Sequence, residues 1–191
     1  MSTAPLRKDA ARNWHRIVEV GRRLVDEDTP FQLNDVARAA SVGVATVYRH
    51  FPTPQALMET LAGPGLEALE RHATRALADP DAWSALRDFL YAAIDAQMTD
   101  ASLARVVASP EHALPPTTRL MRHLNELFGR IVDRARAAGV LNPAVTAADM
   151  APLMCGVTFA ARVHSAGRAE ARAATARRYL GVLLDGLRAA G

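Results

Sequence analysis

Cysteine is nearly absent from this 191-residue sequence, in which Cys155 is the single example. One thiol cannot close an internal disulfide, and it excludes a zinc site built from several cysteines. Long apolar segments are also missing: no run approaches the roughly 18 apolar residues that span a bilayer, and residues 1–9 lack the apolar core of a signal peptide. These absences predict a cytoplasmic protein with no membrane segment.

Aromatic residues make up only 5% of the chain, although 50% of its residues are hydrophobic and alanine is abundant. This composition is typical of packed helices with small contact residues rather than of β-sandwiches or barrels. We therefore expect an all-α fold. The formal net charge of +3 is too small to indicate nucleic-acid binding by itself.

The motifs of common enzyme sites are missing as well. The sequence has no G-x-S-x-G nucleophile turn, and Gly63–Gly65 is followed by Leu66 and Glu67 rather than by the residues of a phosphate-binding loop. Four histidines lack a histidine or cysteine partner at the four-residue spacing of a helical metal site: His72, His112, His123 and His164. The sequence therefore predicts neither an enzyme nor a bound metal or cofactor.

Apolar residues recur at helical spacing along most of the chain. This spacing predicts helices over residues 8–27, 33–40 and 44–51, and a fourth from about 53 to 78 that Gly63, Pro64 and Gly65 should kink or break. Further helices are expected over about 79–98, 102–108, 117–138, 146–165 and 168–189, which gives about nine helices and no strand. We expect two domains, a small three-helix domain over residues 1–52 and a larger helical bundle over residues 53–191.

Two short helices joined by a three-residue turn occupy residues 33–51, LNDVARAASVGVATVYRHF. Helices of two turns are too short to be stable alone, so we expect them to pack on the first helix as a helix-turn-helix unit. Val42, Val47 and Phe51 have the spacing to anchor the second helix inward. Its other side carries small or hydrogen-bonding residues suited to the major groove of DNA: Gly43, Val44, Ala45, Thr46, Tyr48, Arg49 and His50.

The segment DVARAASVGVATVYRHF resembles the DNA-binding signature of TetR/AcrR repressors, which is approximately A-G-V-S-x-G-T-L-Y-x-H-F after a D-I-A segment. The resemblance extends over residues 12–61, since the preceding helix and the Ala56–Leu57 pair also fall in register. It implies that Thr46 and Tyr48 contact DNA phosphates, with His50 nearest the sugar-phosphate chain. The residues that it implies for base or phosphate contacts are Asn34, Arg38, Val44, Ala45 and Arg49.

Three positions depart from this signature and its surroundings. Gly43 replaces the serine, Ala45 replaces the glycine, and Pro54 stands where the family often has a lysine that reaches phosphate. The phosphate contact of that lysine is therefore missing, although backbone N–H groups at the same helix start can face phosphate. Packing of Tyr48 within the small domain, and a solvated position for Arg49, stay open as alternatives.

For residues 53–191 the resemblance implies ligand sensing and dimerisation. The apolar residues expected to line a ligand pocket are Trp83, Phe89, Met98, Met121, Leu124, Phe128, Met154 and Phe159. The residues expected to form a four-helix dimer interface are Met150, Val157, Ala161, Ala173, Ala176, Leu180, Leu184 and Leu187. The alternatives are that the pocket residues form ordinary hydrophobic core and that the interface residues pack within one subunit.

The resemblance further implies a transcriptional regulator that binds a palindromic operator in double-stranded DNA as a homodimer. We expect a repressor that a small, largely apolar effector releases from DNA. A helical protein-interaction module without DNA binding is the alternative function. Salt-dependent affinity for duplex DNA separates the two, because a DNA-binding protein releases counterions from the phosphates.

Overall fold

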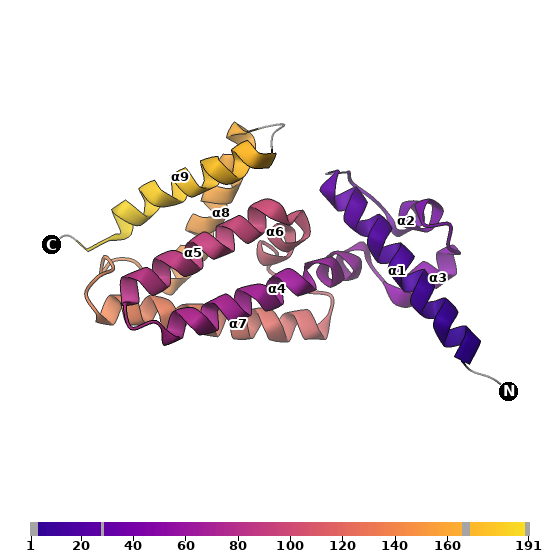
Figure 1. Cartoon of the computed structure of the whole chain (residues 1–191), viewed down its shortest axis with the longest axis horizontal. Helices are drawn as coiled ribbons and strands as arrows, with labels where there is room; N and C mark the ends of the chain where they lie inside the picture. The colour runs from indigo at the N-terminus through magenta and orange to yellow at the C-terminus, as the bar shows by residue number, and fades with distance from the viewer. Residues whose placement is uncertain (1–3, 28, 166–168, 190–191) are drawn as a thin grey trace. The chain divides into compact units, whose positions relative to one another are not determined.

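The computed structural model describes residues 4–27, 29–165 and 169–189, and over these residues the chain folds into nine α-helices (Figure 1). They are α1 (Ala4–Asp26), α2 (Leu33–Ala39), α3 (Val44–His50), α4 (Pro54–Ala78), α5 (Ala82–Thr99), α6 (Ala101–Val107), α7 (Pro115–Ala137), α8 (Ala147–His164) and α9 (Ala169–Leu187). Within the described ranges, β-structure is limited to one isolated bridge between Leu141 and Arg188. The expected all-α class is confirmed.

Two helices differ from the sequence prediction at prolines. Helix α4 continues without interruption through Gly63–Gly65, so the break expected there is wrong. Pro64 removes one backbone N–H and its hydrogen bond, but burial holds the flanking turns, since Leu61 and Leu66 are each 1% exposed. Helix α7 begins at Pro115 rather than at residue 117, because the first turn of a helix tolerates proline.

The chain divides into two compact units. The first contains residues 1–63 and 101–118, and the second contains residues 64–100 and 119–191. Helices α4 and α7 each begin in the first unit and continue into the second. The boundary between the units falls between Gly63 and Pro64 in α4 and between Thr118 and Arg119 in α7.

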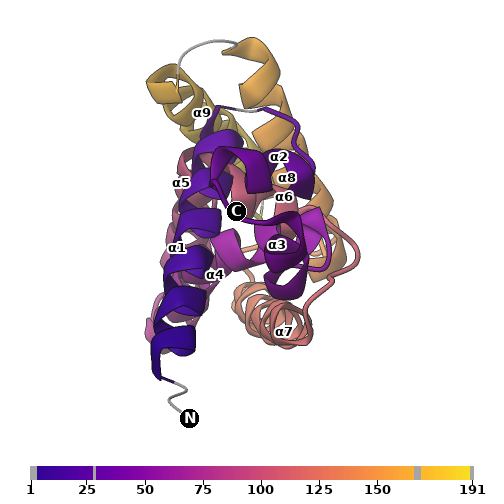
Figure 2. The ribbon, with the colours of Figure 1, turned by 90° about the vertical axis from the view of Figure 1, so that its right-hand side faces the viewer.

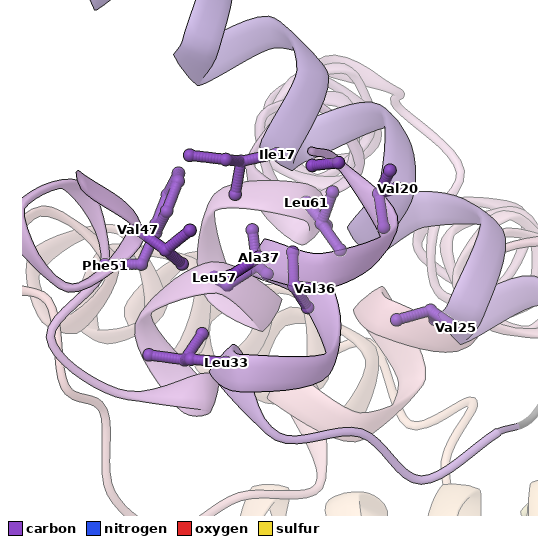
Figure 3. Packing of buried hydrophobic residues seen from close by; sticks show 11 residues of the cluster. Ile17, Val20, Val25, Leu33, Val36, Ala37, Val47, Phe51, Leu57 and Leu61 are labelled. Atoms are coloured by element: carbon purple, nitrogen blue, oxygen red, sulfur yellow. The ribbon is translucent and has the colours of Figure 1, made fainter. Parts of the chain in front are cut away.

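The core of the first unit gathers side chains from α1, α2, α3 and the start of α4, which point toward one another (Figure 3). The buried members are Ile17, Val20, Val25, Leu33, Val36, Ala37, Ala40, Val47, Phe51, Leu57 and Leu61. Each large apolar side chain buried in this way contributes about 1.5–3 kcal/mol relative to an exposed one. The two-turn helices α2 and α3 therefore depend on this cluster for their stability.

In the second unit α9 packs against both α5 and α8, and Figures 1 and 2 show α9 alongside α5. On the outside of this contact, the guanidinium of Arg177 on α9 donates two hydrogen bonds of 2.7 and 2.6 Å to the carboxylate of Asp95 on α5. The guanidinium of Arg188 lies 5.0 Å from the centre of the Trp83 ring. An ion pair and a cation–π contact therefore accompany the apolar packing between these elements.

Candidate DNA-binding surface

Helices α2 and α3 are held in a helix-turn-helix by bonds at each end of the motif. At the start of α2, the backbone N–H of Gln32 donates to the carboxylate of Asp35 over 2.9 Å. In the turn, the N–H of Val42 donates to the carbonyl of Ala37 over 3.0 Å. Helix α3 ends at Phe51, whose backbone is extended before Pro52. These bonds therefore fix the orientation of α3 relative to α2.

The inner side of α3 packs on the core of the first unit. Val47 is fully buried and Phe51 is 3% exposed, while Val42 in the turn is partly buried against the same cluster. These are the three residues whose spacing predicted an inward anchor. Because α3 is only seven residues long, these contacts also determine which of its residues face outward.

The outer side of α3 is open. Val44 is 47% exposed and Tyr48 is 46% exposed. Gly43, Ala45 and Arg49 are exposed, and Thr46 and His50 are half-buried. All seven residues that the sequence placed on the groove-facing side therefore retain solvent contact. A face with small residues, two hydroxyl groups and an arginine can enter a DNA major groove without unpaired buried groups.

Helix α2 adds two exposed polar residues, Asn34 and Arg38. A guanidinium nitrogen of Arg38 lies 3.6 Å from a carboxylate oxygen of Asp35, and both side chains are largely exposed. An exposed pair of this kind contributes little energy. Arg38 can therefore exchange Asp35 for a phosphate at small cost.

Ser41 in the turn is a feature that the sequence analysis missed. Its φ of 52° lies in the left-handed region, and it is the one non-glycine residue of the described chain with a positive φ. The TetR/AcrR signature has glycine at the corresponding position, so comparison with the signature could have identified it. A side chain costs about 1–2 kcal/mol in this conformation.

The first half of α4 is tied to two neighbouring segments of the first unit. Arg22 of α1 donates to the carbonyl of Leu61 and, over 3.2 Å, to the hydroxyl of Ser102 on α6. The carboxylate of Glu59 accepts hydrogen bonds from the backbone N–H groups of Ala113 and Leu114, just before α7 begins. The helix-turn-helix core, α4 and α6 are therefore joined by polar bonds as well as by packing.

Most of the residues expected to line a ligand pocket lie inside the second unit. Phe89, Met121, Leu124 and Met154 are buried, and Trp83, Met98 and Phe128 are half-buried. The rings of Phe89 and Phe128 are 5.3 Å apart. Phe159 is 70% exposed, so its expected place in an interior pocket is wrong. Phe159 lies on the side of α8 opposite the buried residues Thr158 and Ala161.

The stripes expected to form the dimer interface are mostly buried within the single chain. Those covered inside the second unit are Met150, Ala161, Ala176, Leu180, Leu184 and Leu187, while Val157 and Ala173 are half-buried. This burial agrees with the alternative that the stripes pack within one subunit, and a dimer interface at these six residues stays a prediction. Helical spacing identified the apolar side of each helix but not the element that covers it. Where the structure describes burial on α8 and α9, the large apolar residues left exposed are Phe159, Val163 and Val182.

The described residues contain neither a candidate metal site nor a membrane-spanning helix. There, no group of three or more histidine, cysteine, aspartate or glutamate side chains is arranged to hold a metal ion. None of the described helices has the length and apolar character needed to cross a membrane.

Comparison with known proteins identifies the family. Residues 79–189 match the family profile described as the SbtR-like transcriptional regulator C-terminal domain, which covers more than half of the chain. The TetR transcriptional regulator SCO0520 from Streptomyces coelicolor is 28% identical, with a TM-score of 0.55 over 93% of this chain and 99% of that chain. None of the curated proteins matches this sequence.

Two solved structures with lower identity share the fold. The TetR family regulator PfmR from Thermus thermophilus is 22% identical, with a TM-score of 0.61 over 89% of this chain and 97% of that chain. The regulator FadR from Bacillus subtilis, solved with stearoyl-CoA, is 15% identical, with a TM-score of 0.63 over 91% of this chain and 99% of that chain. The family profile, which matches more than half of the chain, shows that the chain belongs to the TetR family of transcriptional regulators.

Proposed function

We propose that this TetR family chain is a cytoplasmic repressor that binds a palindromic operator as a homodimer and leaves it when a small, largely apolar effector binds. The observation that supports DNA binding most directly is the division of α3 into two sides. Val47 is buried in the core, whereas Val44 and Tyr48 are each nearly half exposed. The exposed side chains of the outer side are therefore available to DNA.

Individual roles on this surface follow from chemistry. The Tyr48 hydroxyl and the Thr46 hydroxyl donate hydrogen bonds to phosphates, with His50 beside the sugar-phosphate chain, and these contacts set affinity. Arg49 reads base edges in the major groove, where a guanidinium can bond a guanine with two hydrogen bonds. The residues that complete the proposed readout surface are Asn34, Arg38, Gly43, Val44 and Ala45.

Dimerisation is supported by the apolar residues exposed on α8 and α9. Phe159 and Val163 are one turn apart on α8, at 70% and 63% exposed, and Val182 on α9 is 70% exposed. These three residues, which we name the α8–α9 apolar face, would be covered by the same face of a second copy. A two-fold dimer presents two α3 helices, and a palindromic operator has two matching half-sites.

Effector release requires two states of the chain with different affinities for DNA. Helix α4 continues from one unit into the other at Gly63–Pro64, and we propose that this turn is the hinge. The effector pocket would lie among the half-buried and buried residues of the second unit around Phe89 and Phe128. The acyl-CoA bound to the Bacillus subtilis FadR makes acyl chains a reasonable first set of effectors to test.

Footprinting of the purified protein on the DNA that flanks its own gene tests the proposal, because regulators of this type often act on neighbouring genes. We expect protection of a palindromic site, with two half-sites about one helical turn apart. A protein that protects no DNA would instead favour the helical protein-interaction module. Protection of a single half-site by a monomer would contradict the dimer.

A further inference from the structure

Glu59 is the one charged side chain that is almost completely buried among the residues whose burial the structure describes, at 2% exposed. Its two carboxylate oxygens accept hydrogen bonds from the N–H groups of Ala113, over 2.6 Å, and Leu114, over 2.9 Å. Burial of a carboxylate is unfavourable unless hydrogen bonds compensate for its lost hydration. A carboxylate has about four acceptor positions, so these two bonds leave acceptor capacity unused.

A cavity of about 310 Å³ lies beside Glu59, and all of its lining residues belong to the first unit. Its apolar wall includes Phe31 from the segment before α2, Met58 from α4 and Val106 from α6. A cavity of about 150 Å³ can hold benzene, so this cavity has room for two fused rings with a short substituent. The cavity is therefore of a size suited to a compact organic molecule.

The polar side chains that line the cavity belong to Gln55, Glu59, Arg105, Ser109 and His112, and those with acceptor atoms include the buried carboxylate of Glu59. His112 lines it together with Glu59, and the Nδ1 of His112 is buried without a hydrogen-bond partner among the described residues. This nitrogen is an acceptor when the ring proton is on Nε2. Arg105 also lines the cavity, but its side chain is exposed, where solvent and salt screen its charge. A carboxylate or phosphate ligand would meet the negative charge of Glu59.

We propose that this cavity binds a compact primary amine. Its ring system lies against Phe31, Met58 and Val106, and its ammonium donates hydrogen bonds to Glu59 and His112. An ammonium has three N–H donors and a positive charge, which match two acceptors and a buried carboxylate. The site is separate from the effector pocket proposed above, whose residues belong to the second unit.

Amine binding would change the bonds that join α4 to the segment before α7. The ammonium shares the Glu59 carboxylate with the N–H groups of Ala113 and Leu114 and weakens both bonds. Gln55, one turn earlier on α4, donates to the carbonyl of Glu111 over 2.7 Å and holds the same segment. Because α4 follows α3 directly, we expect an effect on DNA affinity, and this step rests on the proposed function.

Titration of the full chain with three matched probes tests the assignment. The probes are 1-naphthylmethylamine, the neutral 1-naphthylmethanol and the anionic 1-naphthoic acid, followed by calorimetry and by the amide NMR signals of residues 113 and 114. We expect the amine to bind at least about tenfold more tightly than the alcohol, since a hydrogen bond to a charged group exceeds a neutral one. Equal affinities, or shifts confined to the second unit, would overturn the proposal.

Two variants in the cavity and one control variant test where the amine binds. Glu59→Gln removes the charge with little change of shape and should abolish the preference for the amine over the alcohol. Glu67→Gln makes the same change at an exposed position of α4 outside the cavity and should leave that preference intact. Met58→Trp should fill the cavity and abolish binding of the amine. If Glu59→Gln fails to fold by circular dichroism, unchanged amine binding in Met58→Trp would overturn the proposal by itself.

Measuring DNA binding as well distinguishes failure of the amine site from failure of the proposed DNA-binding function. We expect saturating 1-naphthylmethylamine to change the affinity of the wild-type chain for operator DNA and to leave that of Met58→Trp unchanged. A chain that prefers the amine but never binds DNA contradicts only the proposed regulator function. A chain that binds DNA but shows no preference for the amine contradicts only the cavity assignment.

Discussion

Tyr48 lies on the outer side of α3 with its ring nearly half exposed, so its hydroxyl is free to reach a DNA phosphate. Tyr48→Phe keeps the ring and removes the hydroxyl. We expect it to weaken binding to specific and to unrelated DNA equally, by ~1 kcal/mol, because one phosphate hydrogen bond is lost. Fluorescence anisotropy with both kinds of duplex measures the two affinities.

Arg49→Ala is the matched comparison on the same helix. Because Arg49 is assigned to base reading, its loss should lower affinity for the operator more than for unrelated DNA. A Tyr48→Phe effect limited to one operator sequence would remove Tyr48 from the phosphate contacts. An Arg49→Ala loss that is equal on all sequences would remove Arg49 from the readout surface.

Ser41 sits in the turn of the motif with a φ of 52°. Ser41→Gly should raise the free energy of unfolding by about 0.5–1 kcal/mol, because relief of the left-handed strain exceeds the entropy that glycine adds to the unfolded chain. Gly139, at φ 68° after α7, is the converse case, and Gly139→Ala should destabilise the protein. Urea unfolding of both variants tests the pair, and a less stable Ser41→Gly would contradict the strain argument.

At the scale of the helix, Asp149 lies in the first turn of α8 and caps its start. Its carboxylate accepts hydrogen bonds from the hydroxyl of Thr146, over 2.6 Å, and from the N–H of Thr146, over 2.8 Å, and these bonds hold its pKa below the usual 3.8. A carboxyl group with a lowered pKa in the folded state stabilises the fold above its unfolded pKa, and loses this effect as the pH falls through the folded value.

Asp149→Asn should therefore lower the melting temperature at neutral pH, and the difference from wild type should vanish as the pH falls below 3.8. Thermal melts of both proteins between neutral and acidic pH measure this convergence. Glu67→Gln, at an exposed carboxylate inside α4, serves as the control. A difference that stays constant with pH would show that the ionised carboxylate is not the stabilising group.

Pro64 interrupts the hydrogen bonding of α4 at the proposed hinge. Pro64→Ala restores an N–H and should stabilise the protein by up to about 3 kcal/mol, while reducing the change in DNA affinity that an effector causes. Gly129→Ala on α7, outside the proposed hinge, is the control, since an added Cβ at Gly129 meets no atom within 4 Å. If effector-induced release is unchanged in Pro64→Ala, the hinge is not at this turn.

The order and type of the helices could be predicted from the sequence because each helix has a strong apolar period. The continuity of α4 could not, because a local rule for proline takes no account of the burial of Leu61 and Leu66. The outer face of α3 was predictable since Val47 and Phe51 fix its inner side. The element that covers the stripes of α8 and α9 was not predictable, because Leu180 and Leu184 show the same spacing whether their own subunit or a partner covers them.

At the scale of the whole molecule, the proposed dimer depends on the α8–α9 apolar face. Phe159→Asp replaces the aromatic residue of this face, which is 70% exposed, by a charged one. Burying an unpaired charge in a dimer interface is unfavourable. We expect a monomer in sedimentation analysis and an affinity for operator lowered by about tenfold or more, because one subunit reads only half of the site. Asn125→Asp, at an exposed position on α7, should leave the dimer intact. A Phe159→Asp protein that remains dimeric would place the interface elsewhere.

The central claim is that α3 is presented twice, by a symmetric pair of chains, to the major groove of DNA. Measuring the affinity and the stoichiometry of the full chain on duplex DNA from beside its own gene, across a series of salt concentrations, tests this claim directly. We expect two chains per site and an affinity that falls steeply as salt rises, because phosphate contacts release counterions. A chain that stays monomeric and has no affinity for duplex DNA even at low salt would contradict it.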